Sequence, residues 1–89
     1  MRISHTNTID FEYTHRSDGW HMLHEIDDED MGYWSVLEYI IPVESVTKLL
    51  SVISEDAFID ICRKDGLSGM CDFLDSRGIP YHRAEDLRA

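Results

Sequence analysis

Basic residues are scarce in this sequence of 89 residues, which contains 8 lysines and arginines against 18 aspartates and glutamates. The formal net charge of −10 argues against direct binding to nucleic acid, because proteins that bind the phosphate backbone present a basic face. The same charge argues against docking on an anionic membrane surface. We therefore expect neither nucleic acid nor a membrane to be a direct ligand.

Long apolar runs and cysteines are also few. No stretch approaches the roughly 20 apolar residues that cross a bilayer, and the first residues lack the apolar core of a secretory signal. The two cysteines, Cys62 and Cys71, both lie in apolar helical patterns, so we expect reduced, buried thiols. These features predict a cytoplasmic protein that forms a single domain over residues 1–89.

The first half of the chain alternates apolar and polar residues with the period of two that strands require. We expect strands over residues 9–14, 20–26 and 33–41, and Pro42 ends the third strand. The segment Ser17-Asp18-Gly19 predicts a tight turn between the first two strands. The acidic run from Asp27 to Gly32 predicts a loop between the second and the third.

The second half changes to the period of a helix. One apolar stripe comprises Val43, Val46, Leu49, Leu50 and Ile53. Two further short helices are expected over residues 55–64, capped by Ser54, and over residues 68–77, while the polar tail 81–89 is expected to fray. The fold class is therefore α+β: a three-stranded antiparallel meander followed by two or three short helices that pack on one face.

Negative charge is concentrated in the predicted meander. Residues 1–44 contain ten acidic residues against Arg2 and Arg16. Residues on one face lie roughly 6.8 Å apart along a strand, close to the spacing of phosphates along nucleic acid. We expect the carboxylates to form one unpaired negative patch, with Tyr33 and Tyr39 facing outward beside it as anchors. The predicted partner-binding residues are Asp10, Glu12, Asp18, Glu25, Asp27, Asp28, Glu29, Asp30, Tyr33, Glu38 and Tyr39.

The acidic loop and the histidines have other interpretations. A solvated loop that keeps the protein soluble explains the acids without any partner. Calcium is disfavoured because Met31 occupies the fifth position of an EF-hand count that starts at Asp27, although Gly32 and Glu38 fall at the sixth and twelfth. Zinc is disfavoured because His21 and His24 point to opposite faces of a strand. We expect no metal and no cofactor.

Catalysis and DNA binding are also weakly supported. The sequence contains no nucleophile elbow and no phosphate-binding loop, so we do not expect an enzyme. The three predicted helices resemble a helix-turn-helix arrangement, but acidic residues on the same helices would repel phosphates. The basic residues of that alternative are Arg63, Lys64, Arg77, Arg83 and Arg88.

The small size, the charge of −10, the acidic strands and the Asp27–Asp30 run together resemble the small acidic inhibitors of phages and mobile elements. This class includes anti-CRISPR proteins and other DNA mimics, and the chain is similar also to immunity proteins that block nuclease toxins. The resemblance implies an inhibitor that binds a basic site on a protein complex that processes nucleic acid. A structural module that dimerises through a sheet edge remains open, and we expect a monomer or a homodimer.

Overall fold

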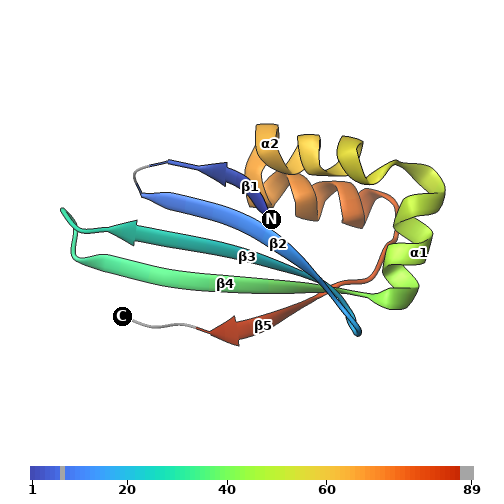
Figure 1. Cartoon of the computed structure of the whole chain (residues 1–89), viewed down its shortest axis with the longest axis horizontal. Coiled ribbons are helices and arrows are strands. Elements are labelled where there is room, and N and C mark those ends of the chain that lie inside the picture. Colours follow the sequence, from blue (N-terminus) through green and yellow to red (C-terminus); the bar gives the residue numbers. More distant parts are fainter. Residues whose placement is uncertain (7, 87–89) are drawn as a thin grey trace.

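The computed structural model describes residues 1–6 and 8–86, with the backbone alone for residues 85 and 86. These residues form an α+β fold of one five-stranded antiparallel sheet and two helices (Figure 1). The strands follow one another across the sheet in chain order. They are β1 (Arg2–His5), β2 (Ile9–Arg16), β3 (Gly19–Asp28), β4 (Tyr33–Pro42) and β5 (His82–Asp86), and the helices are α1 (Val43–Val52) and α2 (Glu55–Ser76).

The meander of β2, β3 and β4 confirms the three predicted strands, but the prediction of only three strands is wrong. The strand β1 adds to the outer edge of β2, where the Met1 amine donates to the Tyr13 carbonyl at 2.8 Å. The strand β5 pairs with β4, so the prediction that residues from 81 onward fray is wrong for residues 82–86. Residues 87–89 of that tail lie outside the described part. Both missed strands are short edge strands, and β1 contributes Ile3 to the core.

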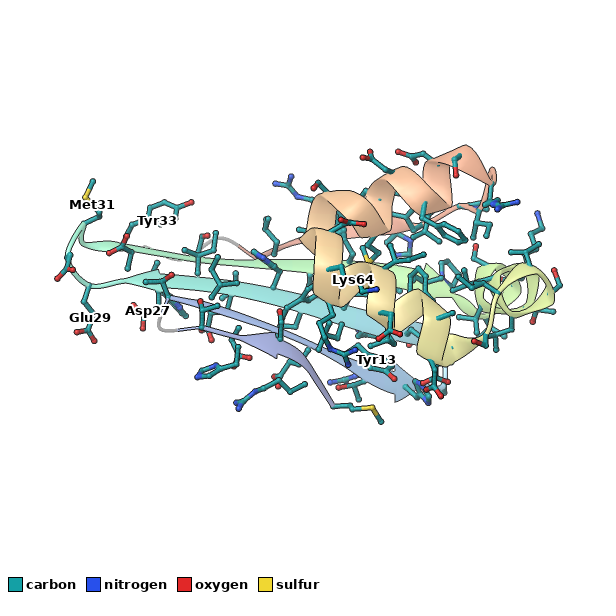
Figure 2. The ribbon with its side chains drawn as sticks, turned by 90° about the horizontal axis from the view of Figure 1, so that it is seen from above. Tyr13, Asp27, Glu29, Met31, Tyr33 and Lys64 are labelled. Atoms are coloured by element: carbon teal, nitrogen blue, oxygen red, sulfur yellow. The ribbon has the colours of Figure 1, made fainter. Side chains whose placement is uncertain are left out.

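The two turns of the meander differ in how well they match the sequence. The tight turn before Gly19 is confirmed. The acidic loop is shorter than predicted, because Asp27 and Asp28 continue β3 and pair with Trp34 and Tyr33. Carboxylates are tolerated at this end of the ladder because the helices do not cover it, as Figure 2 shows.

The helices begin directly after β4. Ser54 caps α2 as predicted, and its side chain accepts a hydrogen bond from the Ala57 backbone N–H at 3.2 Å. The two helices predicted over 55–64 and 68–77 form the single element α2, which kinks at Gly66, where φ is 72° and ψ is −160°. The second half of α2 folds back at this kink (Figure 1).

The core lies between the helices and one face of the sheet. Its fully buried side chains come from both layers: Phe11, Met22, Ile41, Leu49, Phe58, Cys62, Met70 and Leu74. Val43 and Leu50 belong to the predicted apolar stripe of α1 but are 49% and 46% exposed, which corrects that part of the stripe. The molecule measures 42 × 23 × 22 Å, and the helices cover only one end of its long strands (Figures 1 and 2). In the part of the chain that the structure describes, the opposite face of the sheet has no helical layer.

Candidate partner-binding surface

One face of the central strands points away from the helices. Phe11, Tyr13, Trp20, Met22 and Ile41 lie in the core, so the residues between them along each strand must face the other way. We call this surface the open face. On β2, β3 and β4 it comprises Asp10, Glu12, Thr14, His21, Leu23, Glu25, Asp27, Trp34, Val36, Glu38 and Ile40.

The ladder register brings five predicted acids together on the open face. Asp10 of β2 stands directly opposite Glu25 of β3, which places their Cβ atoms about 5 Å apart. Because the strands are antiparallel, Glu12 on β2 and Asp27 on β3 flank this pair on opposite sides. Glu38 of β4 lies across Leu23 from Glu12. The predicted clustering of these carboxylates on one side of the sheet therefore matches the structure.

The acids of the open face are not all unpaired. Arg2 on β1 contacts Asp10, with 3.3 Å between Nε and Oδ1. The Trp34 indole N–H donates to a Glu25 carboxylate oxygen at 2.8 Å. Within the described residues, neither the Glu12 nor the Asp27 side chain has a hydrogen bond or an ion pair. The expectation of one wholly unpaired patch is thus wrong in part.

His21 joins Glu38 to a further predicted acid, Asp18, at the end of the open face nearest the β2–β3 turn. Its Nδ1 lies 2.8 Å from Glu38 Oε1, and its Nε2 lies 2.8 Å from Asp18 Oδ1. The contact with Glu38 is the main cause that raises the pKa of His21 above its ordinary value, against the opposing effect of burial. The hydrogen bond from His21 in turn lowers the pKa of Asp18. The contacts with both carboxylates therefore favour the protonated form of the imidazole in this acidic surface.

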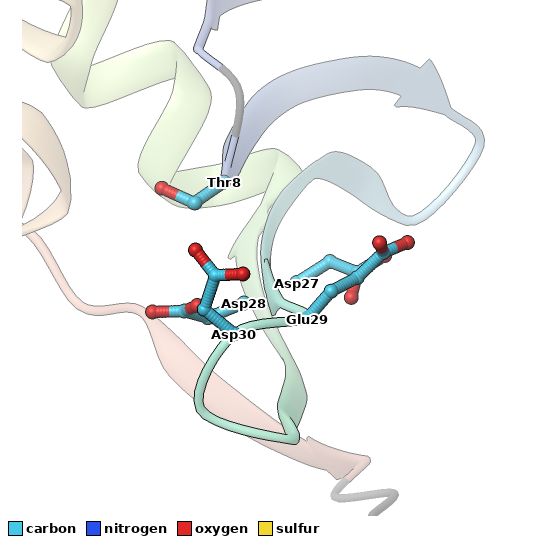
Figure 3. A pocket seen from close by; sticks show the side chains of 5 residues that line it. All are labelled: Thr8, Asp27, Asp28, Glu29 and Asp30. Atoms are coloured by element: carbon cyan, nitrogen blue, oxygen red, sulfur yellow. The ribbon is translucent and has the colours of Figure 1, made fainter.

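Asp27 and the remaining acids lie at the tip of the β3–β4 hairpin. Asp27, Asp28, Glu29 and Asp30, together with Thr8, line a hollow of about 410 Å³ that is open to solvent (Figure 3). In this view Asp28 and Asp30 point to one side, and Asp27 and Glu29 point to the other. Asp28 accepts a hydrogen bond from the Met31 backbone N–H at 3.2 Å, which stabilises the turn.

The two predicted aromatic anchors lie in different environments. Tyr33 is 52% exposed at the tip, beyond the end of the helical layer (Figure 2). Tyr39 is instead half-buried against the core and stacks on Tyr81 at 5.8 Å, so the prediction that it faces outward is wrong. Its register partner Met22 belongs to the core, which fixes Tyr39 on the helix side.

Sequence reasoning missed several residues of this surface. Trp34 and His21 each bind a predicted carboxylate, and Met31 is 78% exposed at the tip. The open face also contains the apolar residues Leu23, Val36 and Ile40 between its acids. The alternation of β4 places Trp34 and Glu38 on one face, and this signal was present in the sequence.

Neither Arg63 of α2 nor Arg77, which follows α2, neutralises the open face. Arg63 binds Asp60 on its own helix and donates to the Ile3 carbonyl at 3.1 Å, and the Arg77 guanidinium lies 5.4 Å from the Phe73 ring centroid. Arg88, named in the helix-turn-helix alternative, lies outside the described residues. None of these contacts involves an acid of the open face.

A second polar cluster joins β2 to the start of α2. Glu55 accepts a hydrogen bond from the Tyr13 hydroxyl at 2.6 Å, and His15 Nε2 lies 3.0 Å from the same oxygen. His15 also stacks on Trp20 at a centroid distance of 4.9 Å. Burial and the Glu55 carboxylate raise the pKa of Tyr13. The cluster fixes the helix on the sheet.

The chemistry of the other candidate groups is limited. Cys62 is buried and Cys71 half-buried, both are free, and burial raises the pKa of Cys62 to about 12. Among the side chains that the structure describes, no group of three or more His, Cys, Asp or Glu is placed to hold a metal ion. No helix in the described ranges is long and apolar enough to span a bilayer.

The comparisons with known proteins add no family to this geometry. Protein-family models, curated proteins and solved structures were compared with the chain, and none of them matches it.

Proposed function

We propose that this protein is a small acidic inhibitor that binds, through the open face and the hairpin tip, a basic site on a protein complex that processes nucleic acid. The partner in this proposal is a basic protein of the cytoplasm, and the surface acts as a mimic of nucleic acid. An immunity protein that neutralises a nuclease toxin would use the same chemistry. The proposal assigns no catalytic step to the chain.

The observation that supports this proposal most is the segregation of charge. Asp10, Glu12, Glu25, Asp27 and Glu38 share a face that no helix covers, and the acids of the tip continue it. Like charges placed this closely destabilise a compact state by self-repulsion, which a purely solubilising role does not require. A basic partner would relieve that repulsion on binding.

Apolar residues share this surface with the acids. Charge complementarity mainly accelerates association and sets the register of a complex, whereas aromatic and aliphatic side chains supply most of the binding energy. Trp34 and Leu23 lie between the carboxylates of the open face, and Met31 and Tyr33 are exposed at the tip. This mixture is what a specific protein interface requires.

The test measures binding and inhibition across a panel of purified CRISPR effector complexes and nuclease toxins. The test variant combines Glu12→Gln with Asp27→Asn, because neither side chain has a partner among the described residues. The control variant combines Glu44→Gln with Asp72→Asn, which removes the same charge from exposed positions on the helices.

We expect the test variant to bind at least tenfold more weakly than the control, with a smaller dependence on salt, since two carboxylates leave the interface. Equal loss in both variants would show that only net charge matters. Unchanged binding in the test variant would overturn the open face as the site.

A structural module is the second candidate, and the two edge strands favour it. The strands β1 and β5 end the sheet on its two sides, and edge strands can pair with another chain. Sedimentation equilibrium distinguishes the two candidates: a stable dimer at micromolar concentration favours the module, and a monomer favours the inhibitor.

A further inference from the structure

We propose that His21 regulates the open face: its imidazolium is an internal counter-ion for Asp18 and Glu38, and loss of its proton strengthens binding of a cationic partner. This inference rests on the proposed function, because it concerns the regulation of the same surface. It assigns a role to a residue that the pattern of acids alone does not identify.

The geometry favours the charged form of the ring. A neutral imidazole has one N–H, so it can donate to only one acceptor, and its other nitrogen carries a lone pair. Both nitrogens of His21 lie 2.8 Å from carboxylate oxygens, which accept and do not donate when ionised. Two short contacts of this kind are charge-assisted hydrogen bonds from an imidazolium.

The charge of His21 affects binding because the two carboxylates that it contacts are accessible to a partner. The side chain is 15% exposed, whereas Asp18 is 61% exposed and Glu38 is 29% exposed, so both carboxylates remain accessible from solvent. A partner's guanidinium or ammonium group would therefore meet the same two acids that the ring holds. The ring competes with the partner for them.

The surroundings of His21 are mostly negative. Thr14 and Ile40 are its direct neighbours on β2 and β4, and neither side chain titrates in this pH range. The ionisable groups on the open-face side of the adjoining strands and turn are Glu12 and Arg16 on β2, Asp18 in the turn, Glu38 on β4 and His82 on β5. Arg16 is the only one of these, within the described side chains, with a permanent positive charge.

Deprotonation has a defined electrostatic consequence. The triad of Asp18, His21 and Glu38 has a formal charge of −1 with the imidazolium and −2 after the proton leaves to solvent. The neutral ring keeps one hydrogen bond and frees the other carboxylate. One extra unit of charge about 4 Å from a partner's cation in water corresponds to about a fivefold change in affinity.

The first experiment titrates His21 itself by NMR of its ring resonances in the free protein. We expect a midpoint above that of a histidine in a random-coil peptide, and two protected ring N–H protons below that midpoint. The variant Glu38→Gln should lower the midpoint, because the main contact that stabilises the imidazolium loses its charge. A midpoint at or below the peptide value would overturn the proposal.

The second experiment measures binding of a deca-arginine peptide at one pH unit below and one unit above that midpoint. Arginine stays charged throughout, so the probe does not titrate. We expect the wild type to bind about fivefold more tightly at the higher pH and His21→Gln to show no such change. The matched control His82→Gln removes another histidine of the open face and should keep the change.

The outcomes separate this proposal from the proposed function. If the affinity of the wild type is the same at both pH values, or if His21→Gln retains the change, the regulatory role of His21 is wrong while the surface can still bind. If the peptide does not bind at either pH, both proposals fail. If His21 regulates peptide binding but no nucleic-acid-processing complex is inhibited, only the proposed function fails.

Discussion

Replacing Gly19 with alanine should destabilise this fold more than replacing any other turn glycine. Gly19 begins β3 with φ of +138°, a conformation that is essentially confined to glycine. A Cβ atom there would lie 2.0 Å from the Ile41 carbonyl oxygen and 2.9 Å from the Pro42 Cα atom. These are backbone atoms of the neighbouring strand, so no side chain can rotate to relieve the overlap.

The loss of unfolding free energy in Gly19→Ala has two contributions. The unfavourable φ costs about 1–3 kcal/mol, and the displacement of β4 that the overlap demands costs about 1–3 kcal/mol more. Gly32, at φ of +64°, provides the matched control, because a Cβ atom there has nothing within 4 Å. Its replacement costs only about 1–2 kcal/mol of left-handed strain. The two variants should therefore differ by about 3 kcal/mol.

The assay is urea denaturation of both variants, followed by tryptophan fluorescence and by circular dichroism. A domain of this size is stabilised by only about 5–15 kcal/mol in total, so Gly19→Ala should unfold at much lower urea or fail to fold. Gly32→Ala should stay folded, with a melting temperature lowered by about 4–15 °C. Equal losses of unfolding free energy in the two variants would refute the close approach of β3 to β4.

Three smaller predictions concern single contacts. Ser54→Ala should cost about 1 kcal/mol in thermal denaturation because it removes the α2 cap, whereas Ser51→Ala, which removes only a bond within a turn of α1, should change little. Tyr13→Phe should cost about 1–3 kcal/mol, measured by urea denaturation, because Glu55 loses its 2.6 Å donor, and an unchanged midpoint would contradict that contact. Burial lowers the pKa of His24, so the folded state resists protonation while the unfolded state binds a proton below about pH 6.5. Wild-type stability should therefore fall as the pH drops from about 6.5 through the lowered pKa, and His24→Leu should lose this part of the pH dependence.

The sequence predicted the elements whose signals are local. The alternation of Phe11 and Tyr13 with polar neighbours identified β2 and its buried face correctly. Ser54 correctly predicted the start of α2. Gly66, which predicted the end of a helix, instead lies at the kink of α2. Such signals depend on a few neighbouring residues, so they can be recognised without knowledge of the whole fold.

Features that depend on pairing between distant residues could not be predicted in this way. The strand β4 has apolar residues on both faces, so its pattern could not assign Tyr39 to the core, and the register with Met22 decides it. The strands β1 and β5 are short edges with little pattern of their own. The two contacts of His21 join Asp18, three residues away, to Glu38, 17 residues away.

The most direct test of the central claim maps where cations gather on the free protein in solution. Paramagnetic relaxation of the backbone amides is measured by NMR with a cationic nitroxide and with a neutral one of the same size. Our account predicts that the ratio of the two effects is largest at Glu12, Leu23 and Asp27 and at the tip from Glu29 to Met31. A ratio that is uniform over the surface, or largest along α1 and α2, would contradict it.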